Sequence, residues 1–227
     1  SFELAREDGA PLPAFSAGSH VDVQIPGGLT RQYSLCNDAG EQHRYRIAVL
    51  RDPASRGGSI GMHEAVNEGD VITISTPKNH FPLEHATTTL LFAGGIGVTP
   101  ILSMAQRLAV TGADFSMHYC SRSQERTAFH SEITAPPFAG KVQFHFDDGD
   151  AAQKLDLLNV LGAPEAGKHL YVCGPTGFIN FVTSTAKTAG WAPGNIHLEY
   201  FGAAPQDTSN DGSFDVKIAS TGQTYTI

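Results

Sequence analysis

The first third of the chain alternates apolar and polar residues over short runs. In Ser19–Ile25 the residues Val21, Val23 and Ile25 fall on one face, which is the pattern of a half-buried strand. Clusters of glycine, proline, asparagine and aspartate separate such runs, as turns do. Short strands at this spacing predict an antiparallel β-barrel over residues 1–86. Its further elements are strands at Arg31–Cys36, Tyr45–Arg51 and Asp70–Ser75, and one or two helical turns after Gly57-Gly58-Ser59, through Met62 to Val66.

The pattern changes after Thr88 to an alternation of strands and helices. Thr89–Ala93 is an apolar run of strand length, and Thr99–Val110 carries apolar residues at helical spacing. Such alternation predicts a mostly parallel sheet with helices on both faces, an α/β domain over residues 87–202. The remaining strands are expected at Asp114–Cys120, Val142–Phe146, His169–Cys173 and Asn195–Tyr200, and the remaining helices at Ala128–Ile133, Leu155–Leu161 and Gly177–Ala189.

The last 25 residues differ from both halves. Residues 203–213 are small, polar and acidic, which is typical of a linker. Residues 214–227 alternate, turn at Thr221-Gly222 and return, which predicts one hairpin. A lone hairpin is marginally stable in water, so we expect it to open a further domain in a longer protein. The alternative is a hairpin that packs back on the preceding domain.

Composition narrows the function classes. A net charge of −8 argues against a nucleic-acid binder, and no apolar run is long enough for a membrane span. Cys36, Cys120 and Cys173 lack zinc or iron–sulfur spacing. We therefore expect no metal site in this segment, and free thiols of the kind found in cytoplasmic proteins. The protein is expected to be monomeric.

Two glycine-bearing turns each join a predicted strand to a predicted helix. Gly94–Pro100 (GGIGVTP) permits close backbone approach and leaves helix N-terminal amides free for a phosphate. Cys173-Gly174-Pro175 (CGP) holds the equivalent place after a later strand. Ligands of open α/β sheets bind at this edge, so the two turns together predict a dinucleotide site there.

Two motifs in the predicted barrel suit a second cofactor. Arg31–Ser34 (RQYS) offers a cation, an aromatic face and a hydroxyl, and Arg56–Ser59 (RGGS) offers backbone amides and a hydroxyl for a phosphate. Taken singly, each motif is more typical of a solvated surface strand or an ordinary glycine turn than of a cofactor site. Their combination with the sheet motifs is more informative.

The order of these motifs, ending in Glu199-Tyr200-Phe201, resembles the ferredoxin–NAD(P) reductase superfamily. Within it the chain is most similar to the phthalate dioxygenase reductase-like branch, which includes vanillate demethylase reductases, over Phe2 to Phe201. The resemblance implies the reductase component of a Rieske-type oxygenase. Such a protein transfers hydride from NADH to FMN, then single electrons through a [2Fe-2S] centre to a terminal oxygenase. The hairpin looks like the start of the ferredoxin-like domain that carries the cluster, but the chain ends before any C-x4-C-x2-C.

The resemblance also implies roles for single residues. Tyr33 would stack on the flavin, Ser34 would hydrogen-bond its N5, and Arg31 would bind its phosphate. The implied catalytic set is Ser34, Cys173, Glu199 and Phe201, of which Phe201 would cover the flavin. The implied flavin set is Arg31, Gln32, Tyr33, Ser34, Ile47, Ala48, Val49, Arg56, Gly57, Gly58, Ser59, Thr99 and Phe201. The implied dinucleotide set is Gly95, Gly97, Thr99, Pro100, Ser121, Arg122, Arg126, Cys173, Gly174 and Pro175.

Three alternatives stay open at this point. An FAD-dependent NAD(P)H:ferredoxin or flavodoxin reductase would need an aromatic platform for the adenine, which the sequence does not identify. A non-catalytic flavin-binding regulatory subunit would not need Ser34, Cys173 and Glu199. NADPH could replace NADH if Arg122 and Arg126 pair with a 2′-phosphate.

Overall fold

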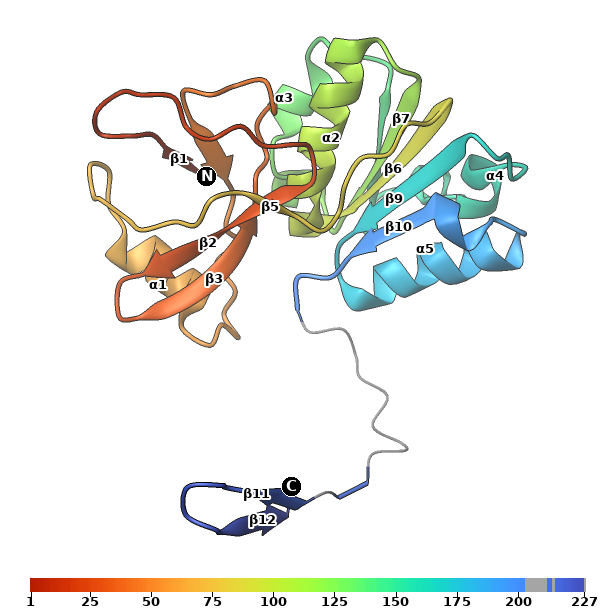
Figure 1. Ribbon diagram of the computed structural model, residues 1–227. Coiled ribbons are helices and arrows are strands. Elements are labelled where there is room, and N and C mark those ends of the chain that lie inside the picture. The colour runs from red at the N-terminus through yellow and green to blue at the C-terminus, as the bar shows by residue number, and fades with distance from the viewer. Residues whose placement is uncertain (203–211, 214, 227) are drawn as a thin grey trace.

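The computed structural model describes residues 1–202, 212–213 and 215–226. Two domains lie side by side, followed by a separate hairpin (Figure 1). The first domain contains strands β1 (Phe2–Leu4), β2 (Ser19–Ile25), β3 (Leu29–Ser34), β4 (Tyr45–Ile47) and β5 (Lys78–Asn79), and helix α1 (Gly58–Ala65).

The first domain is built from two small antiparallel sheets. One has the order β3-β2-β5 and the other pairs β1 with β4, and a single bridge between Leu35 and Ile47 links them. As the alternation predicted, Val21, Val23 and Ile25 of β2 lie inside the domain core. The sheets are antiparallel as expected, but a closed barrel is not confirmed.

The predicted strand Asp70–Ser75 does not form. Only Ile74 makes a bridge, to Val23 of β2, and Val71 is 83% exposed. Single backbone bonds at Thr73 and Ser75 reach β2, but no continuous ladder follows. The alternation marked a segment that lies along β2 without the regular pairing that defines a strand. The predicted strands Arg31–Cys36 and Tyr45–Arg51 likewise end early, at Ser34 and Ile47.

The second domain has the predicted parallel sheet, in the order β10-β9-β6-β7-β8. Every predicted strand and helix of this domain is present, with ends shifted by one or two residues at most positions. The strands are β6 (Thr88–Gly94), β7 (Phe115–Ser121), β8 (Val142–Phe146), β9 (Lys168–Cys173) and β10 (Ile196–Glu199). The helices are α2 (Val98–Thr111), α3 (His130–Thr134), α4 (Leu157–Leu161) and α5 (Thr176–Thr188), with single 3-10 turns at Gly95–Gly97, Gln124–Arg126, Ala151–Gln153 and Pro193–Asn195.

Helices cover both faces of this sheet, because successive residues of each strand point to opposite sides. Along β6, Leu91 packs under α2, whereas Leu90 and Phe92 pack with α4 and α5. The core under α2 also contains Ala17 and Phe81 of the first domain. The two domains therefore share a continuous apolar interface.

The C-terminal hairpin pairs β11 (Asp215–Lys217) with β12 (Thr224–Thr226), and all its described residues are exposed. The predicted linker falls almost wholly on residues 203–211, which lie outside the described residues, as do Phe214 and Ile227. The ferredoxin-like identity of the hairpin and the domain limits stay predictions. Within the described ranges, no helix has both the length and the apolar character needed to cross a membrane.

Candidate functional site

A pocket of about 320 Å³ lies where β3 and β4 of the first domain meet the start of α2. Most of the predicted flavin residues line it, although they come from distant parts of the chain. The pocket has the size and mixed polarity of a small-molecule site. The predicted flavin residues that line it are Arg31, Gln32, Tyr33, Ser34, Ala48, Val49, Arg56, Ser59, Thr99 and Phe201.

One end of this pocket is suited to an anion. Arg31 donates through Nη2 to the carbonyl of Arg56 at 3.3 Å, which holds its guanidinium beside the RGGS turn. A Cβ on Gly58 would lie 2.7 Å from Nε of Arg31, so a larger residue there would displace the Arg31 side chain. Gly57 has φ of +87° and precedes α1, whose Ser59 amide donates to Oγ of Ser55 at 3.2 Å. A cation beside the start of a helix suits the phosphate of a flavin.

Not all of the predicted flavin residues line the pocket. The side chain of Ile47 is fully buried in the core of the first domain, while Ala48 and Val49 line the pocket. Gly57 and Gly58 border the pocket through the turn rather than lining it. Sequence reasoning missed five lining residues. Four of them precede the RGGS turn, namely Leu50, Asp52, Ala54 and Ser55, and the fifth, Ile96, lies within GGIGVTP.

The two glycine turns of the sheet meet at its carboxyl edge. A Cβ on Gly97 would lie 2.4 Å from the carbonyl carbon and oxygen of Cys173, and one on Gly174 would lie 2.9 Å from Cα of Gly94. The glycines are therefore required by this backbone contact. The hydroxyl of Tyr119 donates to the carbonyl of Gly95 at 3.0 Å and holds the first turn. Pro100, the last residue of GGIGVTP, is buried in the first turn of α2.

The predicted catalytic residues converge between the two domains. Ser34 Oγ donates to Glu199 Oε2 at 3.4 Å, which joins β3 to the end of β10. Glu199 stands beside Cys173 in the parallel register of β10 and β9. Phe201 follows two residues later, lines the 320 Å³ pocket and is 50% exposed. An exposed aromatic ring at this place can cover a bound cofactor and still move aside.

Burial raises the pKa of both acidic groups at this junction. Desolvation raises the pKa of Glu199 to about 7, against a smaller lowering by the hydrogen bond from Ser34. Burial, with the nearby Glu199 carboxyl, also raises the pKa of the Cys173 thiol well above its usual range. Cys173 is therefore a neutral thiol, and Glu199 exchanges its proton near neutral pH.

A second pocket, of about 780 Å³, lies at the ends of β7 and β8. It borders the loop after β7, but Ser121, Arg122 and Arg126, the residues of the implied dinucleotide set in this region, do not line it. The hydroxyl of Ser121 is 2.7 Å from that of Thr127 and closes the loop instead. The lining residues are Ser123, Gln124, Glu125, His130, Phe146, Asp148, Gly149 and Gln153.

Sequence reasoning missed the two carboxylates of this pocket, those of Glu125 and Asp148. A signal was present, because Asp147-Asp148 directly follows β8 at the same sheet edge as the glycine turns. Applying the edge rule to every strand, rather than only to those followed by glycine, would have found Asp148.

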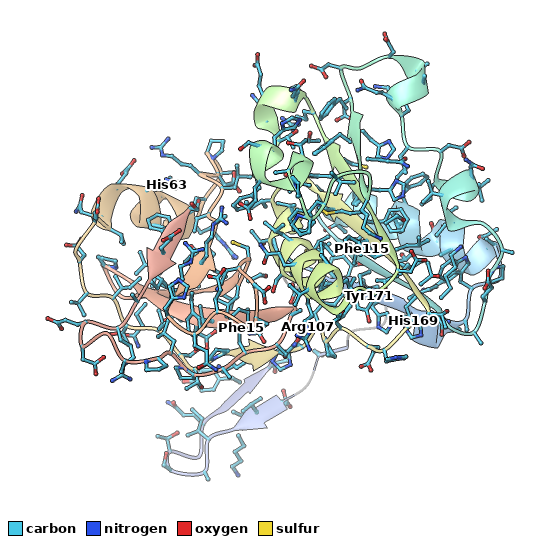
Figure 2. The ribbon with its side chains drawn as sticks, turned by 90° about the horizontal axis from the view of Figure 1, so that it is seen from above. Phe15, His63, Arg107, Phe115, His169 and Tyr171 are labelled. Carbon is cyan, nitrogen blue, oxygen red and sulfur yellow. The ribbon has the colours of Figure 1, made fainter. Side chains whose placement is uncertain are left out.

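A larger pocket, of about 810 Å³, lies between the domains at the opposite edge of the sheet, where β6 and β7 begin. Phe15 of the first domain and Arg107 of α2 face this seam (Figure 2). None of the predicted site residues lines it. Size alone therefore does not identify the functional site here. Nowhere in the described ranges do three His, Cys, Asp or Glu side chains gather as metal ligands would.

Comparison with known proteins agrees with this geometry. The family model described as "dimethylamine monooxygenase subunit DmmA-like, N-terminal domain" matches residues 78–196. A vanillate O-demethylase oxidoreductase of Pseudomonas sp. (strain HR199) is 54% identical over 228 residues, covering 100% of this chain and 72% of that protein. The reductase subunit of a tert-butanol monooxygenase / tert-amyl alcohol desaturase of Aquincola tertiaricarbonis is 44% identical, covering 100% of this chain and 70% of its own.

The fold matches a solved relative equally well. The structure of phthalate dioxygenase reductase, described as modular for electron transfer from pyridine nucleotides to [2Fe-2S], superposes with a TM-score of 0.84 at 40% identity. The match covers 100% of this chain and 70% of that one. The chain therefore belongs to the family of oxidoreductases that serve as reductase components of oxygenases, together with vanillate O-demethylase oxidoreductase and phthalate dioxygenase reductase.

Proposed function

We propose that this chain takes hydride from NADH onto a bound FMN and passes the electrons singly, through a [2Fe-2S] centre, to a terminal oxygenase. The observation that carries the proposal is the contact between Ser34 and Glu199, which joins the flavin motif of one domain to the dinucleotide motif of the other. A bound flavin would supply acceptance of two electrons at once and their release one at a time.

The first domain supplies the residues that would hold the flavin. Arg31 and the RGGS turn suit its phosphate, and the half-buried ring of Tyr33 suits stacking against a flat ring system. Tyr33 and Phe201 are the only aromatic residues among the described residues that line the pocket. That composition supports FMN over FAD, because an adenine would need a surface of its own.

The residues at the junction would orient the reacting groups and control protons. Ser34 Oγ holds Glu199 across the domain boundary, and Cys173 fills the space beneath it as a neutral thiol. With a pKa near 7, Glu199 can hold a proton on its carboxyl and give it up without a large cost. Phe201 would exclude water until the nicotinamide displaces it.

The 780 Å³ pocket at the ends of β7 and β8, where we place the adenosine, supports NADH over NADPH. The Glu125 and Asp148 carboxylates line it, whereas Arg122 and Arg126 do not. A carboxylate accepts hydrogen bonds from ribose hydroxyls and repels a 2′-phosphate. We infer a preference for NADH, and kcat/KM measured with each dinucleotide tests it.

The [2Fe-2S] centre is proposed to lie beyond these residues. The hairpin β11–β12 exposes Val216, Ile218 and Tyr225, which is the condition of strands that lack a covering layer. The solved relative whose description includes [2Fe-2S] is longer than this chain. Iron and acid-labile sulfide analysis of the protein purified from its native source, together with its intact mass, tests this part.

The central test is spectroscopic. The purified chain should bind FMN, released flavin should be identified as FMN by chromatography, and NADH should bleach the flavin absorbance under anaerobic conditions. A colourless protein that does not bind FMN would refute the proposal. A protein that binds FMN but is not reduced by either dinucleotide would support the regulatory alternative.

A further inference from the structure

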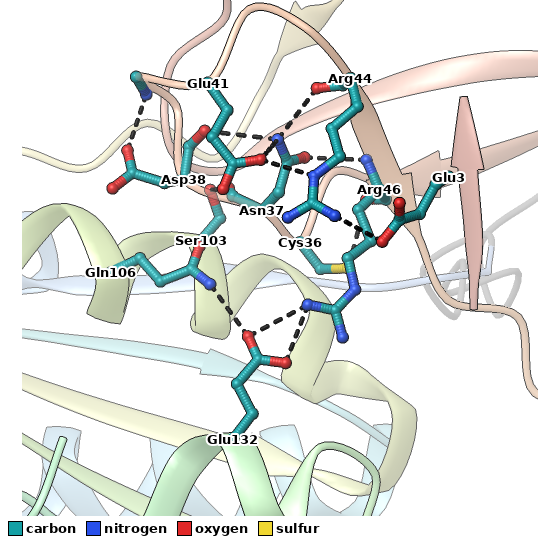
Figure 3. Close-up of polar contacts among 11 residues, drawn as sticks. Glu3, Cys36, Asn37, Asp38, Glu41, Arg44, Arg46, Ser103, Gln106 and Glu132 are labelled. Atoms are coloured by element: carbon teal, nitrogen blue, oxygen red, sulfur yellow. Dashed lines mark hydrogen bonds and ion pairs between the residues drawn. The ribbon is translucent and has the colours of Figure 1, made fainter. Parts of the chain in front are cut away.

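Besides the contact between Ser34 and Glu199, the two domains are joined by an ion pair between Arg46 and Glu132 (Figure 3). Arg46 of β4 donates through Nη1 to both carboxylate oxygens of Glu132 in α3, at 2.8 and 3.1 Å. Gln106 of α2 adds a hydrogen bond to the same carboxylate at 3.3 Å. The side chains of the pair are only 17% and 31% exposed. Removing the charge of one residue would leave the charge of the other partly buried and unpaired.

Arg46 also contacts the residue that precedes α3. Its guanidinium carbon lies 4.5 Å from the centroid of the Phe129 ring. Phe129 has φ of +60°, the left-handed region that costs a bulky residue conformational energy. Such a conformation persists where surrounding contacts hold it. Arg46 therefore contacts both the N-cap residue and the Glu132 carboxylate of this short helix.

At its own end, Arg46 is part of the strand that leads into the flavin pocket. Its amide donates to Oδ1 of Asn37 at 2.9 Å, and its carbonyl accepts from the amide of Cys36 at 2.8 Å. Ser103 of α2 donates to the carbonyl of Asn37 at 3.0 Å. Two residues after Arg46 the chain reaches Ala48, which lines the pocket. A shift of Arg46 would therefore move the wall of the flavin site.

At the other end, α3 is connected to the dinucleotide turns. The amide of Ala128, just before Phe129, donates to the hydroxyl of Tyr119 at 3.2 Å. That hydroxyl donates in turn to the carbonyl of Gly95. Arg46 thus connects the flavin wall to the GGIGVTP turn, through its contact with the Phe129 ring and the hydrogen bonds made by Ala128 and Tyr119.

We propose that Arg46 and Glu132 are positioning residues, which hold the dinucleotide domain at a fixed spacing from the β4 wall of the flavin pocket. The movement that admits the nicotinamide is then confined to Glu199 and Phe201. This inference rests on the proposed function. The apolar interface between the domains is not directional, whereas hydride transfer needs the reacting atoms in a near-attack geometry. The hydrogen-bonded ion pair supplies a directional contact that fixes the spacing.

The test uses the flavin-loaded chain with Glu132→Gln, Arg46→Gln and the double variant. Each single variant should lower the limiting rate of flavin reduction at saturating NADH by roughly tenfold or more, because a small misplacement has that effect. The dissociation constant for FMN should change less than the reduction rate, since neither residue lines the pocket. The double variant should cost much less than the product of the single effects, as expected for a pair that acts as a unit.

A second readout does not depend on activity. Amide hydrogen exchange should become faster at β4 and over residues 128–134 in each variant, with the rest of both domains unchanged. Glu132→Asp keeps the charge and shortens the side chain, so it should lower the reduction rate even if Glu132→Gln folds poorly. Glu3→Gln is the matched control, because it breaks an ion pair with Arg44 at 2.6 Å that lies within the first domain alone. It should leave the reduction rate unchanged.

Two outcomes would overturn the inference. Variants that lower the unfolding temperature but keep the wild-type reduction rate and exchange pattern would show a purely structural contact. Single effects that multiply in the double variant would show two independent residues. If the wild-type chain binds no flavin or is not reduced by NADH, the proposed function fails instead, and the exchange measurement still decides whether Arg46 and Glu132 hold the domains together.

Discussion

Glu199 should make the stability of this protein fall as the pH rises from 5 to 8. Burial raises its pKa from an ordinary value of 4.5 to about 7. The folded protein therefore keeps the proton at pH values where the unfolded chain has already lost it. A group of this kind destabilises the folded state above its unfolded pKa, and the loss grows until the pH passes the folded pKa. Replacing Glu199 with glutamine removes the titration but keeps an oxygen that accepts from Ser34.

The shift sets the size of the effect. Integrating the linkage relation between pH 5 and pH 8 gives a loss of roughly 2.5 kcal/mol in wild type that Glu199→Gln should not show. For a chain of this length such a difference corresponds to roughly 5 to 10 °C in unfolding temperature. Between pH 7 and pH 8 the remaining change should be small, because the folded carboxyl is then largely ionised.

The assay is thermal or urea unfolding of the chain without flavin or dinucleotide, at pH 5, 6, 7 and 8. The measured quantity is the difference in stability between Glu199→Gln and wild type at each pH. Ser34→Ala is the companion variant, since it removes the hydrogen bond that lowers the pKa of Glu199 and should steepen the dependence. Parallel pH curves for wild type and Glu199→Gln would refute the reasoning, because they would mean that Glu199 has the same pKa in both states.

Three further predictions follow from the site geometry. Arg31→Ala should weaken FMN binding by about 1.5–3 kcal/mol, the value of a hydrogen bond to a charged group, as measured by fluorescence titration; an unchanged dissociation constant would place the phosphate elsewhere. Ser34→Ala should leave FMN bound but slow its reduction by NADH in stopped-flow absorbance, and a wild-type rate would contradict its role beside Glu199. Gly97→Ala should destabilise the chain by roughly 2 kcal/mol or more through overpacking, because its Cβ would meet the Cys173 backbone at 2.4 Å. Gly177→Ala, whose Cβ meets nothing within 4 Å, is the control, and equal loss in both variants would be inconsistent with a specific clash.

The sequence alone determined the second domain and the edge at which its chemistry lies. Strand and helix periodicity in this half is a local property of the sequence. The glycines of GGIGVTP and CGP indicate where two backbone segments approach each other closely. The contact between Gly97 and Cys173 is the physical counterpart of that signal. The family resemblance then predicted that Ser34, Cys173 and Glu199 belong to one site.

The tertiary structure decided the features that depend on pairing between distant segments. Whether Asp70–Ser75 forms a strand, and whether the first domain closes into a barrel, depends on ladders that alternation does not specify. Ile47 is in the core because its side of β4 faces inward, which the motif did not reveal.

The polar contacts between domains lie furthest from the reach of sequence reasoning. Arg46 and Glu132 are 86 residues apart and belong to no motif, so only the packing of α3 against β4 brings them within hydrogen-bond distance. Periodicity and turn chemistry are local, whereas the spacing between two domains is set by side chains that meet only after both have folded.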